Sequence, residues 1–463
     1  MAQTAVQNDF SKGSLWRIIL NQSVPLMVAQ LVHVLYNVVD RVYLGHLPGA
    51  SSLALTGVGL IFPIVALVSA FCALFSTGGA PLCAIARGAG EKERAEKLLN
   101  NTFSMLLIMA VLMTAAGYLF RKPILYLFGA SNDTYAYAND YLKIYLAGTA
   151  FSMITTGMNG FINLQGFPKV GMMTTLLGAV LNVILDPIFI FAFDMGVKGA
   201  ALATVISQAV SALWVLQFLL GKKAILRIRL RYMRPEGKLL KEITTLGIPG
   251  FIMSGTNCLV QVTCNATLGL WGGDVYIGVM TVINSIREIF TIPLTGLTQG
   301  AQPVISFNYG AKEYDRVRRG IVILSVASIS VTTVCWILIL LFPRPVLSLF
   351  SNDTALVDVG VRCVRQYFLG FFLQSLQFAG QHSFVALGKS KQAIFFSLLR
   401  KVVIVFPLTL LLPHLGGLGV SGVFLAEPVS NLLGGTSCFV TMLLTVWPML
   451  KREEQKLLEQ PKA

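Results

Sequence analysis

The sequence predicts an all-α membrane protein with twelve transmembrane helices in two pseudo-symmetric six-helix bundles. Three observations predict this fold class: the composition, the recurrence of long apolar stretches and an internal repeat. Of the 463 residues, 55% are hydrophobic and only 12% are charged, with a mean hydropathy of +0.71. Soluble domains carry about a quarter charged residues. Most of this chain is therefore expected to contact lipid.

Twelve apolar stretches are each long enough to cross a hydrocarbon layer roughly 30 Å thick. Because they are continuous rather than alternating, they favour helices over a closed barrel, the only other structure that spans lipid. Glycine and proline clusters or short charged loops separate them. The stretches lie near residues 18–45, 53–80, 100–120, 140–163, 170–193, 197–220, 242–270, 275–304, 320–342, 361–387, 392–413 and 418–448.

The second half of the chain repeats the first at an offset of about 222 positions. PILYLFGASNDT at 123–134 recurs, two residues shorter, as PVLSLFSNDT at 345–354, and GVKGAALAT at 196–204 recurs as GVSGVFLAE at 419–427. Such a repeat indicates that one structural unit is present twice. Two equivalent halves in a very apolar chain are typical of secondary transporters, whose halves move against each other around a shared site.

Loop charges predict the orientation. Residues 222–241 contain many Lys and Arg residues against the single acid Glu236, which places this segment in the cytoplasm. Every second loop agrees, since 87–97 and 312–319 are basic whereas 271–274 has no Lys or Arg. We therefore expect a multi-pass protein of the cell membrane, either inner or plasma membrane, with both termini in the cytoplasm.

The same segment divides the chain. We expect a first six-helix bundle at 1–221, a basic cytoplasmic linker at 222–241, a second bundle at 242–450 and a charged C-terminal tail at 451–463. Within the repeat, the two Ser-Asn-Asp-Thr segments contain glycosylation sequons, but the same residues are strong helix N-caps, and we favour capping.

A few ionisable residues lie inside the predicted helices, where each costs roughly 2.5 to 3.5 kcal/mol on insertion scales. Asp40 lies in the first helix and Asp186 in the fifth. Asn182 precedes Asp186 by four residues, so their oxygens share one helical face. Pro187 removes a backbone hydrogen bond and loosens the helix beside this carboxylate. Thr204, in the sixth helix, adds a hydroxyl.

These groups form either a site for a hard cation or a pair of carboxylates that share a proton. The alternative is structural: Arg41 or His33 neutralises Asp40, while Asn182 and Asp186 only bond across helices. Neighbouring residues point about 100° apart on a helix, so Arg41 is a poor direct partner for Asp40. We favour the functional interpretation, because acids inside a membrane are functional by default.

The second half does not repeat these charges, since Cys264 and Glu427 stand at the positions of Asp40 and Thr204. Arg287 and Glu288 are adjacent in the eighth helix, where a substrate role and a simple interface pair are equally open. Arg400 and Lys401 are further polar candidates in helix eleven. The residues that we expect in a substrate cavity are Tyr36, Asn37, Arg287, Glu288 and Glu427.

The sequence as a whole resembles the multidrug and toxic compound extrusion (MATE) transporters. The resemblance covers essentially the whole chain and is carried by VDRVYLG at 39–45, by the set Asn182, Asp186 and Thr204, and by the basic central loop. It implies a V-shaped pair of six-helix bundles related by a twofold axis along the membrane normal.

The resemblance also implies roles. Asp40 matches the helix-one aspartate that the family uses for cation coupling, and Asp40, Asn182, Asp186 and Thr204 would bind H⁺ or Na⁺, with no other cofactor. The protein would export lipophilic, often cationic, aromatic compounds in exchange for that ion, and we expect it to act as a monomer. Another branch keeps acids in helices seven and ten. This chain has only Asp358 at the start of helix ten, which favours the MepA-like and DinF-like branch.

Two alternatives remain. A flippase for a lipid-linked precursor, related in fold, should have more cationic residues in its cavity than Arg287, Arg400 and Lys401 provide. A membrane enzyme such as a prenyl transferase should contain clustered aspartates for Mg²⁺, and the sequence has no DDxxD-like cluster. It also lacks a nucleotide-binding GxxxxGK[ST] motif, so the energy should come from an ion gradient, and it has no basic soluble domain for nucleic acid.

Overall fold

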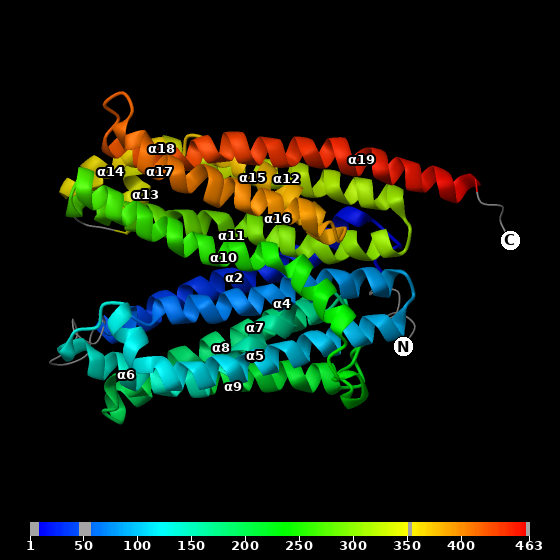
Figure 1. Cartoon of the computed structure of the whole chain (residues 1–463), viewed down its shortest axis with the longest axis horizontal. Helices are drawn as coiled ribbons and strands as arrows, with labels where there is room; N and C mark the ends of the chain where they lie inside the picture. Colours follow the sequence, from blue (N-terminus) through cyan, green and yellow to red (C-terminus); the bar gives the residue numbers. More distant parts are fainter. Residues whose placement is uncertain (1–8, 46–56, 351–353, 460–463) are drawn as a thin grey trace. The chain divides into compact units, whose positions relative to one another are not determined.

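The computed structural model describes residues 9–45, 57–350 and 354–459, and every regular element in these ranges is a helix (Figure 1). Ten helices within them are long and apolar enough to cross a membrane. The helices of the first half are α2 (Leu15–Gly45), α4 (Phe62–Gly88), α5 (Lys92–Leu127), α6 (Asn132–Ala147), α7 (Thr149–Asn163), α8 (Pro168–Pro187), η1 (Ile188–Ala192), α9 (Gly196–Leu220) and η2 (Leu230–Tyr232).

The helices of the second half follow the same order, with more interruptions. They are α10 (Gly237–Trp271), α11 (Asp274–Gly310), α12 (Tyr314–Leu341), α13 (Pro343–Ser348), α14 (Thr354–Tyr367), η3 (Phe371–Leu373), α15 (Gln374–Ala386), α16 (Ser390–Leu398), η4 (Leu399–Val405), α17 (Phe406–Leu411), η5 (Leu412–His414), α18 (Val420–Ser430), η6 (Asn431–Gly435) and α19 (Thr436–Glu459).

The chain forms two compact units. Unit 1 contains Val28–Arg87 and Glu91–Ser254, and unit 2 contains Phe10–Met27, Gly88–Gly90 and Gly255–Ala463. The helices that lead the two halves, α2 and α10, therefore each contribute residues to both units. The basic linker packs within unit 1.

Two of the predicted crossings are each built from two shorter helices. The stretch 140–163 is α6 followed by α7, and the break lies at Gly148. A methyl group on Gly148 would come within 2.5 Å of Val205 on α9, so the small residue permits close packing there and weakens the helix. The stretch 361–387 breaks at the repeat-equivalent Gly370, between α14 and α15. The two halves of the chain thus share the positions at which these helices are interrupted.

The predicted capping role of the first Ser-Asn-Asp-Thr segment is confirmed. The Ser131 hydroxyl accepts a hydrogen bond from the backbone N–H of Thr134, and the Thr134 hydroxyl accepts one from the N–H of Ser131. This reciprocal capping box fixes the start of α6. In the copy, residues 351–353 lie outside the described residues, and α14 begins at Thr354.

The α-helical turns of α8 end at Pro187, directly after Asp186, and the chain continues as the π-helix η1. Proline removes the hydrogen bond that would continue the α-helix. Short π-helical turns inside long helices are frequently found at functional sites. The helix that corresponds to α8 in the second half also contains π-helical turns, in η4, but these precede Pro407.

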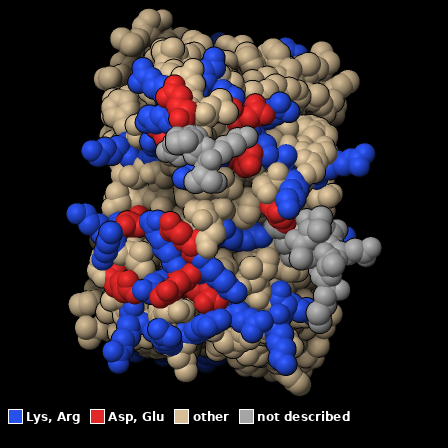
Figure 2. Space-filling view, turned by 90° about the vertical axis from the view of Figure 1, so that its right-hand side faces the viewer, with Lys and Arg blue, Asp and Glu red and all other residues tan. Residues whose placement is uncertain are grey.

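The basic linker is held on unit 1 by buried amide side chains of α5. Asn100 donates to the carbonyl of Arg227 at 3.1 Å and accepts from the N–H of Arg229 at 2.8 Å. Asn101 accepts from the N–H of Glu236 at 2.8 Å. Figure 2 shows the Lys and Arg side chains gathered on this face of the molecule, as expected for a cytoplasmic side.

We expect Asn100→Ala to loosen the linker and to increase its cleavage by trypsin several-fold. The substitution removes both linker hydrogen bonds and leaves two backbone groups unsatisfied, which costs about 1–3 kcal/mol. Limited proteolysis of the purified protein measures the effect, with cleavage after Lys456, in the exposed last turn of α19, as the internal control. Equal linker cleavage in both proteins would contradict this role of Asn100.

Candidate functional site

A cluster of polar side chains lies inside unit 1, within helices that are otherwise apolar. Four helices supply it, and the interactions below join its members into one group. The members, which we call the acidic cluster, are Tyr36 and Asp40 of α2, Tyr141 of α6, Asn182 and Asp186 of α8, and Thr204 of α9.

Asn182 is the centre of this cluster. Its amide Nδ2 donates to Asp186 Oδ1 at 3.3 Å and to Thr204 Oγ1 at 3.4 Å. The Thr204 hydroxyl in turn donates to the carbonyl of Ala200 at 3.0 Å. Asn182 and Asp186 are both almost fully buried. The structure therefore brings together three of the residues that the sequence proposed as one site.

The fourth, Asp40, faces Asp186 from α2. The two carboxyl groups are close enough to interact electrostatically. When both are ionised, their negative charges repel each other. A proton or a cation between them would remove this repulsion.

Two buried oxygens of the cluster receive no hydrogen bond from any described residue: Asn182 Oδ1 and Asp186 Oδ2. Buried polar atoms are nearly always satisfied, so such an atom calls for a specific explanation. Oxygen ligands from carboxylate, amide and hydroxyl groups suit a hard cation, and a carboxyl pair suits a shared proton. The residues present thus fit Na⁺ or H⁺ equally well.

Two tyrosines surround the carboxyl pair. Tyr36 interacts electrostatically with both Asp40 and Asp186. Tyr141 lies beside Thr204 and interacts electrostatically with Asp40. The sequence predicts a role for Tyr36 but not for Tyr141, because a tyrosine in an apolar helix has no distinguishing spacing. Only the packing of α6 against α9 brings its hydroxyl to the cluster.

The structural alternative for Asp40 involves residues of the same helix. His33 packs edge to face against Tyr36, with 5.2 Å between the ring centres. The side chains of Arg41 and of the proposed cavity residue Asn37 lie outside the described residues.

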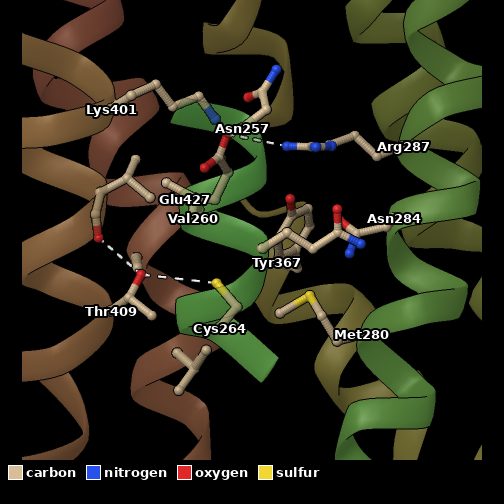
Figure 3. A pocket seen from close by; sticks show the side chains of 14 residues that line it. Asn257, Val260, Cys264, Met280, Asn284, Arg287, Tyr367, Lys401, Thr409 and Glu427 are labelled. Atoms are coloured by element: carbon tan, nitrogen blue, oxygen red, sulfur yellow. Dashed lines mark hydrogen bonds and ion pairs between the residues drawn. The ribbon is translucent and has the colours of Figure 1, made fainter. Parts of the chain in front are cut away.

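The charged candidates of the second half separate into two groups. Arg287 and Glu427 line a pocket within unit 2, where Arg287 Nη1 lies 3.7 Å from Glu427 Oε1 (Figure 3). Glu288 points elsewhere: it is exposed on α11 and makes no ion pair with a described residue. Asp358, the acid of helix ten, is paired with Arg344 on the surface and does not line the pocket.

Comparison with known proteins gives a consistent result. The model of the MatE family matches residues 25–188 and again 249–411, one match in each half. The multidrug export protein MepA of Staphylococcus saprophyticus is 27% identical over 455 residues, which cover 97% of this chain and 98% of that protein. MepA of Staphylococcus haemolyticus is also 27% identical and covers 96% of both chains.

Solved structures show the same fold. An outward-facing multidrug resistance transporter of the MOP superfamily superposes with a TM-score of 0.89 at 23% identity, covering 96% of this chain and 98% of that one. A MOP-superfamily transporter of Pyrococcus furiosus gives a TM-score of 0.87 at 24% identity, with the same coverage. These likenesses confirm the predicted all-α membrane fold.

Proposed function

Since this chain belongs to the MatE family of multi-pass membrane transporters, we propose that it is a secondary antiporter. It exports lipophilic, often cationic, aromatic compounds in exchange for H⁺ or Na⁺ bound at Asp40, Asn182, Asp186 and Thr204. The full-length similarity to multidrug export proteins supports this substrate class over a lipid-linked precursor. Membership in a transporter family removes the membrane-enzyme alternative.

The observation that carries the proposal is the approach of the Asp40 and Asp186 carboxyl groups beside the unsatisfied oxygens of Asn182 and Asp186. A cation or proton between Asp40 and Asp186 replaces their repulsion with attraction, so it holds α2 and α8 together at this point. Release of the cation removes that restraint. Because the cation binds the two arrangements with different affinity, it shifts the equilibrium between them, which is the requirement for coupling.

The proposed substrate contacts follow from charge. Glu288 presents an exposed carboxylate within the membrane-spanning length of α11, where a cationic substrate is a natural partner. Tyr36, one turn before Asp40 on α2, places an aromatic ring beside the acidic cluster, and the proposed contact of Asn37 lies outside the described side chains. Arg287 and Glu427 belong to the unit 2 pocket, where a contact with substrate would be ionic.

The test is substrate efflux from proteoliposomes under a pH gradient alone and under a sodium gradient alone. The proposal predicts efflux against the substrate gradient with at least one of the two, and the effective gradient identifies the ion. Efflux that is insensitive to both gradients would overturn the proposal. A protonophore or a sodium ionophore, added in separate runs, must abolish the effect of the matching gradient.

We expect Tyr141→Phe to reduce coupled transport severalfold without abolishing it. The substitution removes a hydroxyl that lies near Thr204 and Asp40 but retains the aromatic ring. A single hydrogen bond contributes about 0.5–1.5 kcal/mol, which corresponds to a modest change in cation affinity. The measurement is the external H⁺ or Na⁺ concentration at half-maximal efflux. Tyr118→Phe is the matched control, since its hydroxyl donates to the exposed carbonyl of Lys143; an equal shift in both variants would contradict the assignment.

A further inference from the structure

The pocket of unit 2 has an excess of buried positive charge. Three cationic side chains, Arg287, Arg400 and Lys401, surround the carboxylate of Glu427. Figure 3 shows Lys401 and Arg287 pointing toward Glu427 from opposite sides. Glu427 is the only acid among the pocket-lining residues, which all belong to the described part of unit 2. Even with the Lys401 amine uncharged, two guanidinium groups would face one carboxylate.

Glu427 does not accept hydrogen bonds from all the N–H donors of these cations. Its Oε1 accepts from Arg400 Nη2 at 2.5 Å, whereas Lys401 Nζ is 3.5 Å away. Arg400 also donates to Asn431 Oδ1 at 2.8 Å, but its Nε is buried without a partner among the described residues. A lysine ammonium has three donors, and Glu427 is the one described acceptor of Lys401. Some N–H donors of the cations around Glu427 therefore have no acceptor among the described residues.

This pocket corresponds to the acidic cluster in the repeat. Cys264 on α10 and Glu427 on α18 stand at the positions of Asp40 and Thr204, and both line the pocket. Lys401 lies in η4, within the helix that corresponds to α8, and Tyr367 extends from α14, the counterpart of α6. The two halves therefore build a polar cluster from equivalent helices, acidic in unit 1 and mainly cationic in unit 2.

From this geometry we propose that the unit 2 pocket binds a small monovalent anion between Lys401 and Arg287, the two cations that line it. An uncompensated cation is costly at this depth, and an anion compensates it. The cavity has a volume of about 30 Å³. This is roughly the room that two water molecules need, at 10–15 Å³ each. A halide or a carboxylate group fits that space, and a whole drug-sized molecule does not.

The neighbouring polar groups suit the same ligand. The Tyr367 hydroxyl and the amides of Asn257 and Asn284 line the cavity together with Arg287 and Lys401 (Figure 3). Hydroxyl and amide N–H groups donate to an anion and fix its position. Two sources can supply it: free chloride, or the carboxylate of a transported molecule. The second source rests on the proposed export function, whereas the first does not.

The primary experiment measures anion binding without transport. The purified full-length protein is unfolded thermally in sodium gluconate, which is replaced stepwise by sodium chloride or sodium acetate at constant ionic strength. We expect the midpoint temperature to rise and saturate with the small anion, because ligands that bind the folded state stabilise it. In Lys401→Gln, half-saturation should require at least about tenfold more anion. Lys391→Gln, the same change at an exposed lysine of α16, should leave the curve unchanged.

A wild-type midpoint that does not respond to either anion would overturn the proposal, and this result needs no variant. An unchanged half-saturation concentration in Lys401→Gln would also overturn it. If that variant does not fold, Arg287→Gln replaces it, since Glu427 then keeps its closer bond to Arg400.

A second arm distinguishes the two sources. Proteoliposomes loaded with a carboxylate-bearing cationic dye, or with its methyl ester, report efflux under the active ion gradient. If the carboxylate of the substrate occupies the pocket, Lys401→Gln slows export of the acid several-fold more than export of the ester. Equal slowing, together with a chloride-dependent midpoint temperature, assigns the site to free chloride. If the wild type exports neither compound, the proposed export function is contradicted. The anion binding measured by thermal unfolding does not depend on that result.

Discussion

We expect Asp186→Asn to reduce gradient-driven export to the level of liposomes without protein. Asn has nearly the same shape, so the buried position stays filled, and its amide can still bond to Asn182. It cannot take up a proton, and it offers a cation no charge. The substitution therefore leaves Asp40 as a single carboxylate and removes the repulsion whose neutralisation would couple ion binding to helix position.

The matched control is Asp194→Asn. Asp194 is exposed, outside the acidic cluster, and has a positive φ of 51° that Asn also tolerates. The same chemical change there should leave efflux unchanged. Efflux of Asp186→Asn at the wild-type rate under the active gradient would show that the cluster has no coupling role.

The second large effect concerns stability. We expect Glu427→Gln to destabilise the protein by about 3 kcal/mol, because removal of one partner leaves buried charges uncompensated. Arg400 and Lys401 are both buried and lose their shared carboxylate. Thermal unfolding in gluconate measures the loss in the absence of a small anion that could replace the carboxylate.

Glu288→Gln is the control for this experiment. It is the same substitution in a membrane-spanning helix, at an exposed position that forms no ion pair with a described residue. Its unfolding temperature should match the wild type. If the unfolding temperature of Glu427→Gln is not lower than that of Glu288→Gln, Glu427 does not stabilise the fold by compensating Arg400 and Lys401.

Much of the fold could be predicted from the sequence, because lipid imposes few solutions on a backbone. Long apolar runs must be helices, and the repeat indicated two equivalent halves. The breaks at Gly148 and Gly370 could not be predicted, since they depend on how closely α9 and α18 approach these glycines. A glycine in an apolar run is otherwise compatible with an uninterrupted helix.

The candidate site, like the fold, could be predicted only in part from the sequence. The spacing of Asn182 and Asp186 predicted their contact, because four residues make one helical turn. The approach of Asp40 and the contact of Tyr141 depend on packing between helices that are far apart in sequence. In the second half, Arg400 and Glu427 form a pair across 27 positions, and the sequence identified both residues without identifying the pair.

The most direct test of the central claim is the release of the coupling cation when substrate binds. Binding linkage is reciprocal, so a cation that favours substrate release must itself be released by substrate. A pH-sensitive dye and a sodium electrode report this release from the purified protein in weakly buffered solution. We predict release of H⁺ or Na⁺ from the wild type and none from the Asp40→Asn/Asp186→Asn double variant. Equal release from both proteins would contradict it.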